Sequence, residues 1–108
     1  MTEARMEWQK NRLTLDGHAG GGPRGQDIIC AAESMLTQAL LQTLIDLEEE
    51  KKCSVDWIGS AEGGYLQVDA AAAAGYEETI ETCFRMTVTG LRMLEERYPE
   101  HIKLTEEG

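Results

Sequence analysis

His18 and Cys30 have the residue types and the setting that nucleophilic catalysis needs. His18 follows an apolar run, and Cys30 opens a long helical pattern of apolar residues that begins at Asp27. The nucleophile of such a pair is the thiolate, which the partial positive charge of a helix N-terminus and a neighbouring imidazole both favour. We therefore expect Asp27 to cap the helix, Cys30 to lie in its first turn, and His18 to take the thiol proton.

Two further polar residues have expected roles near the sulfur. Asp27 either caps the helix alone or also orients His18 or contacts the substrate backbone. It is expected to face amides or the imidazole, because a carboxylate beside the sulfur would disfavour the thiolate. Ser34 follows Cys30 by one helical turn and therefore shares its helix face. We expect Ser34 to allow close packing near the sulfur, with a hydrogen bond to the reacting centre as the alternative.

A glycine-rich segment connects the histidine to the cysteine, with glycines at Gly20, Gly21, Gly22 and Gly25. It matches the dinucleotide-binding pattern G-x-G-x-x-G, but that fingerprint needs an acidic residue about 20 positions further on, at a second parallel strand. Here that distance falls inside the expected helix, and no lysine follows Gly25 as it would in a phosphate-binding loop. We therefore expect a mobile loop that admits a peptide between His18 and Cys30, with a plain solvated connection as the alternative.

This part of the chain resembles the ribosomal-processing cysteine protease (Prp) family. The resemblance lies in the string Gly17-His18-Ala19-Gly20 and in the string Gly25-Gln26-Asp27-Ile28-Ile29-Cys30-Ala31-Ala32-Glu33-Ser34. It extends over nearly the whole chain, to the closing Arg97-Tyr98-Pro99-Glu100-His101-Ile102-Lys103.

The resemblance implies a small cytoplasmic endopeptidase that removes the N-terminal extension of one large-subunit ribosomal protein, with Cys30 as nucleophile and His18 as general base. It also implies a homodimer, which broad apolar helix stripes permit. The peptide substrate would be a ribosomal-protein precursor with apolar and aromatic residues before the cut. The loop is richer in glycine than the family pattern, which often has an aromatic residue soon after His-Ala-Gly. This departure bears on substrate detail more than on the chemistry.

The composition indicates the class of protein. A chain of 108 residues is long enough for one core, so we expect a single domain over residues 1–108. The net charge of −10 argues against direct nucleic-acid binding, which needs clustered Lys and Arg, and suits a basic peptide better. No apolar run approaches the roughly 20 residues of a membrane helix, so no membrane partner is expected.

The three cysteines, Cys30, Cys53 and Cys83, point to a reducing compartment, because their number is odd and neither paired spacing nor a signal peptide is evident. We therefore expect a cytoplasmic protein. Cys53 and Cys83 fall on apolar faces and are expected to be packing residues. A metal site built from His18 and Cys30 with Cys53 or His101 has no CxxC or HxxxH spacing in its favour, so neither a metal nor another cofactor is expected.

Hydrophobic periodicity predicts two hairpins, each followed by a helix, and a short final strand. The expected elements are strands at 4–9 and 13–16, a helix from Asp27 to about Leu47, strands at 53–59 and 65–68, a helix at 76–98 ended by Pro99, and a strand at 101–104. The alanine run 70–74 is interpreted as a lead-in to the second helix, because Gly75 follows it. This ββαββαβ order predicts an α+β fold of two layers, with both helices on one face of a mostly antiparallel sheet.

Two other interpretations of the cysteine stay open. In a non-catalytic, ribosome-associated protein-binding module of the same fold, Cys30 would be a structural residue, as small buried cysteines often are. In a redox-sensing protein Cys30 would form a sulfenate, although no resolving cysteine lies nearby in the sequence. The large aromatic side chains are expected in the core or in the wall of a groove: Trp8, Trp57, Tyr65 and Phe84.

Overall fold

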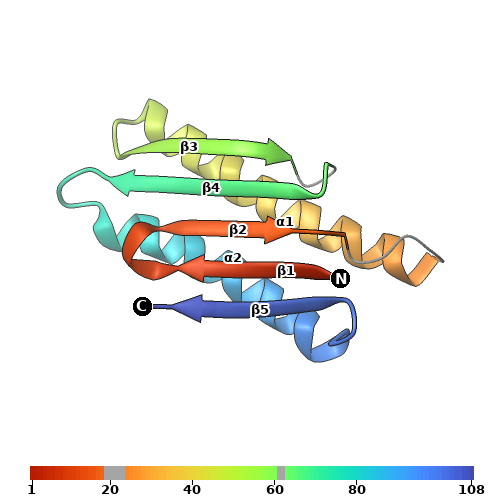
Figure 1. The fold of residues 1–108 in the computed structure, drawn as a ribbon. Coiled ribbons are helices and arrows are strands. Elements are labelled where there is room, and N and C mark those ends of the chain that lie inside the picture. Colours follow the sequence, from red (N-terminus) through yellow and green to blue (C-terminus); the bar gives the residue numbers. More distant parts are fainter. Residues whose placement is uncertain (19–23, 61–62) are drawn as a thin grey trace.

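The computed structural model (Figure 1) describes residues 1–18, 24–60 and 63–108 and, for residues 24–27, the backbone alone. In chain order the elements are β1 (Thr2–Glu7), the short 3-10 helix η1 (Trp8–Lys10), β2 (Arg12–Asp16), α1 (Arg24–Glu49), β3 (Cys53–Ser60), β4 (Tyr65–Ala72), α2 (Glu77–Arg97) and β5 (Ile102–Glu107). Apart from the 3-10 turn inside the first hairpin, this is the predicted ββαββαβ order.

The five strands form one sheet in the order β3-β4-β2-β1-β5. Neighbouring strands run antiparallel except β1 and β5, which are parallel because α2 carries the chain back across the sheet before β5 begins. Both helices lie on the same face of this sheet (Figure 1). The predicted two-layer α+β fold is therefore confirmed.

The core lies between the sheet and the helices, and it follows from the alternation of inward and outward side chains along each strand. In β1 and β2 the buried inward residues are Ala4, Met6, Leu13 and Leu15. The helices contribute Leu44 and Phe84, both fully buried. Burial of a Leu, Met or Phe side chain in this core stabilises the fold by roughly 1.5–3 kcal/mol relative to the exposed side chain. The opposite face of the sheet is polar and carries the ion pair between Arg12 and Asp69 at 2.9 Å.

Helix α1 begins at Arg24, three residues before the predicted start. Asp27 is therefore the fourth residue of the helix, so its predicted N-cap position is wrong, and so is the predicted extension of the loop to Gln26. Cys30 lies in the second turn of α1 instead of the first, where the effect of the helix dipole is weaker. The sequence held a signal for the earlier start, because proline is common at helix starts and Pro23 stands directly before Arg24.

The strands are longer than the sequence pattern indicated, apart from the first. Strand β4 continues to Ala72, with Ala70 buried in the core, so residues 70–72 of the alanine run belong to the sheet, which the sequence did not predict. Only residues 73–74 lead toward α2, as predicted. Strand β5 runs from Ile102 to Glu107, which confirms and extends the predicted final strand. Strand β1 ends at Glu7, and Trp8 begins the 3-10 turn instead of continuing the strand.

Helix α1 is more apolar than its place in the core requires. The segment Ile28–Glu49 is long and apolar enough to cross a membrane, so the sequence prediction that no run approaches that length is wrong. Its inner face nevertheless packs as in a core helix, since Leu40 and Leu44 are buried. On its outer face Ile28 and Met35 are exposed, although both belong to the predicted apolar stripe.

Two of the predicted packing assignments concern cysteines. Cys53 is buried, and Cys83 is half-buried against the core, so both are packing residues as predicted. Among the aromatic residues, Phe84 is buried in the core, whereas Trp57 on the edge strand β3 is 49% exposed. The prediction of a core or groove position for the aromatic side chains therefore holds for Phe84 and for Trp8, which is partly buried against the core, whereas Trp57 does not belong to the core.

Candidate active site

His18 stands two residues after the end of β2, where two glycines fix the course of the chain. The Gly17 N–H donates a hydrogen bond to the carbonyl of Gly64 at 2.7 Å, which ties the end of β2 to the residue before β4. Both glycines have positive φ, +97° and +83°, a region that L side chains rarely adopt. A Cβ at Gly64 would lie 2.6 Å from Nε2 of His18, so the imidazole packs directly against the backbone of Gly64.

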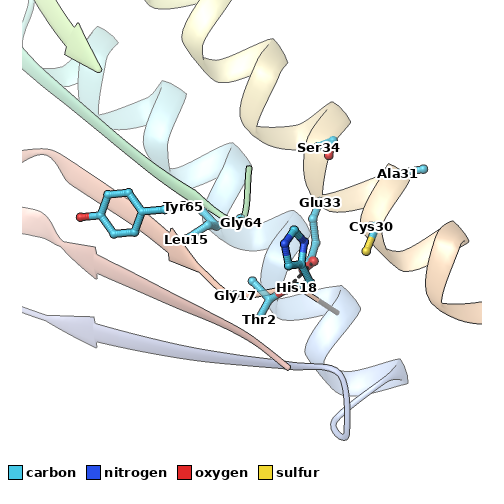
Figure 2. A pocket seen from close by; sticks show the side chains of 10 residues that line it. All are labelled: Thr2, Leu15, Gly17, His18, Cys30, Ala31, Glu33, Ser34, Gly64 and Tyr65. Atoms are coloured by element: carbon cyan, nitrogen blue, oxygen red, sulfur yellow. Dashed lines mark hydrogen bonds between the residues drawn. The ribbon is translucent and has the colours of Figure 1, made fainter. Parts of the chain in front are cut away.

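Cys30 lies on α1, which passes over the same end of the sheet. Its thiol is half-buried and points to the side of the helix on which His18 lies (Figure 2). The two side chains line one pocket of about 300 Å³. We call it the His18–Cys30 pocket; its lining residues are Thr2, Leu15, Gly17, His18, Cys30, Ala31, Glu33, Ser34, Gly64 and Tyr65.

A buried carboxyl group forms part of this pocket. Glu33 follows Cys30 by one turn of α1 and is only 5% exposed. Its Oε1 accepts a hydrogen bond from the Thr2 hydroxyl of β1 at 2.9 Å. Its Oε2 is buried without a hydrogen-bond partner among the described residues. Such an unsatisfied group is unusual, because buried polar atoms are nearly always hydrogen-bonded.

The surroundings of Glu33 alter its acidity. Burial raises the pKa of Glu33 above its ordinary value, because the charged form loses its hydration. The hydrogen bond from Thr2, the α-amino group of Met1 and the neighbouring His18 all lower that pKa, without cancelling the effect of burial. The carboxyl group is thus electrostatically coupled to His18.

The pocket brings together three of the residues that the sequence singled out: His18, Cys30 and Ser34. The described residues show no hydrogen bond between His18 and Cys30; such catalytic contacts often form fully only when substrate binds. The side chain of Asp27 lies outside the described part of the chain, as do the predicted loop glycines Gly20, Gly21 and Gly22. The remaining predicted loop glycine, Gly25, belongs to the first turn of α1 instead.

Sequence reasoning did not identify Glu33, Thr2 or Gly64 as site residues. The signal for Glu33 was its position, because it is a charged residue one helical turn after the candidate nucleophile and next to inward-facing positions of α1. Thr2 carried no comparable signal, since its contact with Glu33 spans 31 positions of sequence. The position of Gly64 against the imidazole depends on the pairing of β2 with β4, which periodicity alone does not give.

Fold and pocket together define a small two-layer α+β domain with a cysteine and a histidine at one end of its sheet. The family model described as "Cysteine protease Prp" matches residues 1–103. The chain therefore belongs to the Prp cysteine protease family, and the family resemblance found in the sequence is confirmed. The comparison with curated proteins finds no match.

Solved structures share the fold over almost the whole chain. The ribosomal processing protease Prp of Staphylococcus aureus, in complex with a covalently linked product peptide, is 23% identical with a TM-score of 0.80, and the match covers 99% of this chain and 100% of that one. The same protease with a substrate peptide is 21% identical, with a TM-score of 0.74 and coverage of 98% and 97%. SMU.848 from Streptococcus mutans is 27% identical, with a TM-score of 0.75 and coverage of 98% and 91%.

Proposed function

We propose that this protein is a cysteine endopeptidase that removes the N-terminal extension of a large-subunit ribosomal protein during ribosome maturation. The observation that carries the proposal is that Cys30 and His18 line the same 300 Å³ pocket in a chain of the Prp family. Further support comes from the S. aureus structures, in which the ribosomal processing protease is bound to a product peptide or a substrate peptide.

In the proposed reaction Cys30 is the nucleophile and His18 the general base. His18 takes the proton of the thiol, and the sulfur attacks the scissile carbonyl carbon to form a tetrahedral oxyanion. The intermediate collapses to a thioester as the C–N bond breaks, and the imidazolium gives its proton to the leaving amine. Water, deprotonated by His18, then hydrolyses the thioester and regenerates the thiol.

The oxyanion must be stabilised by N–H groups that are not already hydrogen-bonded to another acceptor. Cys30 is the seventh residue of α1, so its own N–H is positioned for the intrahelical bond to residue 26. The first four amides of the helix, at residues 24–27, have no intrahelical acceptor. We assign oxyanion stabilisation to these first-turn amides, and losing one such donor typically costs roughly 3–4 kcal/mol of transition-state stabilisation.

The supporting residues remain those predicted from the sequence. Asp27 orients His18 or contacts the substrate backbone, and Ser34 allows close packing at the sulfur or donates a hydrogen bond there. The glycines Gly20, Gly21 and Gly22 admit the peptide.

We also propose that the protein acts in the cytoplasm as a homodimer. Support for self-association comes from the outer surface of the helix layer, where Met35, Met86 and Met93 are more than half exposed. An apolar groove of about 220 Å³ between α1 and α2 adjoins two of these methionines. Light scattering after size exclusion is expected to give twice the monomer mass for the wild type and the monomer mass for Met86→Glu. A monomeric wild type would contradict the dimer.

The peptidase proposal is tested with the ribosomal-protein precursor of the same organism as substrate. We expect a single N-terminal cut, detected by intact mass, that disappears in Cys30→Ser and in His18→Ala. Cys83→Ser is the matched control, because it replaces a half-buried thiol outside the pocket and should leave the cut unchanged. A cut that survives in Cys30→Ser would contradict the assigned nucleophile, and an uncut wild-type reaction would favour the non-catalytic protein-binding module.

A further inference from the structure

We propose that Glu33 is a positioning residue for His18: through Oε2 it accepts a hydrogen bond from one ring nitrogen, while the other ring nitrogen faces Cys30. The inference rests on the proposed peptidase function and adds a third side chain to the two that perform it. Thr2 completes the arrangement by holding the opposite oxygen of the carboxyl group.

The two carboxyl oxygens of Glu33 have unequal environments. Oε1 of Glu33 is fixed by the Thr2 hydroxyl at 2.9 Å, which sets the orientation of the whole group. Oε2 has no donor among the described residues, although it is shielded from solvent. A buried acceptor left without a donor costs about 1–3 kcal/mol, and more when it is charged. This carboxyl group therefore requires a donor that approaches from the pocket.

The side chains around Oε2 differ in whether they have a hydrogen-bond donor available. The Thr2 hydroxyl is already used on Oε1, and the Tyr65 hydroxyl donates to Gln67 and points away from the pocket (Figure 2). The imidazole of His18 projects into the same part of the pocket as the Glu33 side chain (Figure 2). His18 is exposed and forms no hydrogen bond with the described residues, so among them no other acceptor competes with Oε2 for its ring N–H.

The linkage would assist catalysis without adding a proton-transfer step. His18 takes the Cys30 proton on the nitrogen facing the sulfur, and the second nitrogen keeps its hydrogen and its bond to Oε2. The carboxylate compensates the positive charge that the ring then carries, and the proton later goes to the leaving amine. Glu33 neither gains nor loses a proton, as for the carboxylate of a Ser–His–Asp triad.

The contact itself is tested by NMR of the histidine ring signals in the intact protein, with His101→Gln used to assign them. In Glu33→Gln the ring-nitrogen and ring-proton signals of His18 should move from their wild-type positions, because one ring nitrogen loses its carboxylate acceptor. Glu33→Asp, which keeps the carboxylate, should move these signals less. Glu49→Gln is the matched control, because Glu49 is an exposed glutamate of the same helix. The other charged group close to the carboxyl, the α-amino group of Met1, is unchanged in all variants.

The catalytic role is tested by kinetics on the peptide substrate. Glu33→Gln should lower kcat by roughly 10- to 100-fold, a part of the 10²–10⁴-fold that general acid–base catalysis contributes, while KM stays within about two-fold. Glu33→Asp, which keeps a carboxylate, should recover part of the lost kcat. A purely structural role for Glu33 would change stability without this selective loss and recovery of kcat.

The two proposals can fail separately. A wild-type protein that cuts, together with a Glu33→Gln variant whose kcat and His18 ring signals match the wild type, would overturn the positioning role and leave the peptidase proposal intact. A wild-type protein that does not cut would overturn the peptidase proposal, and the His18 ring signals would then still decide whether Glu33 holds the imidazole. A circular-dichroism melt of each variant verifies that the folded state is being compared.

Discussion

Replacing Gly64 by alanine should displace the His18 imidazole in the His18–Cys30 pocket, although Gly64 itself takes no part in the reaction. The φ of Gly64 is +83°, and the added Cβ would lie 2.6 Å from Nε2 of His18 and 3.1 Å from its Cε1. Ordinary van der Waals contact begins near 3.4 Å. The imidazole must therefore move by about 0.8 Å, because the new Cβ is attached directly to the backbone, whereas the ring is at the end of a side chain.

The expected magnitudes follow from these two effects. A left-handed conformation costs an L residue roughly 1–2 kcal/mol, which in a domain of this size corresponds to a fall in Tm of roughly 5–15 °C. A misplacement of about 1 Å in a catalytic group can cost about 10²-fold in rate. We therefore expect kcat/KM to fall by about two orders of magnitude, mainly through kcat.

The chain supplies a matched control for the backbone effect. Gly75 has a similar φ of +91°, but a Cβ there would meet no atom within 4 Å. Gly75→Ala should therefore lose comparable stability, measured by thermal unfolding, and keep wild-type kcat/KM on the precursor. If Gly64→Ala retained wild-type kcat/KM while its Tm fell like that of Gly75→Ala, the position assigned to His18 in the working site would be refuted.

Three further predictions concern the buried carboxyl group and the thiols. Thr2→Val removes the hydrogen-bond donor of Glu33 and should lower the free energy of unfolding by about 1–3 kcal/mol in urea, whereas Thr2→Ser should not; equal stability of all three proteins would contradict the bond. Iodoacetamide at pH 7 should alkylate Cys30 before Cys53 and Cys83, because burial raises the pKa of both of those thiols; equal labelling in peptide mass spectra would favour the non-catalytic module. Burial raises the pKa of Glu33 above about 4.5, its ordinary value, so the folded state binds this proton more tightly than the unfolded state and ionised Glu33 opposes folding as the pH rises. Glu33→Gln should therefore unfold at higher urea concentration than wild type at pH 7 and lose that advantage at pH 4, and the reverse trend would show that burial does not dominate.

The sequence predicted the layers and the order of the elements because each element carries its own periodicity. Met6, Leu13 and Leu15 alternate with polar residues, and the helix stripes repeat at three- and four-residue steps. Periodicity does not report where a helix starts, and the first apolar residue of the helical pattern, Ile28, comes after the first turn of α1. Asp27 was consequently assigned to a cap that lies several residues earlier.

Only those parts of the site that depend on residue type and on neighbouring sequence could be predicted. His18 and Cys30 stood out through residue type and the intervening glycines, and the fold brings both to one pocket. The contact between Thr2 and Glu33, and the approach of His18 to Gly64, depend on which strands pair and in what register. Both contacts join residues that are far apart in the sequence, so the spacing of residues along the chain does not predict them.

Covalent participation of Cys30 in peptide cleavage is the central claim about this protein. Acid-quenching the precursor reaction during turnover, followed by intact-mass and peptide-mapping mass spectrometry, tests this directly. We expect the released N-terminal fragment to appear as a thioester on the Cys30 sulfur and to be absent from Cys30→Ser. Cleavage that proceeds with the fragment bound at another residue would contradict the account.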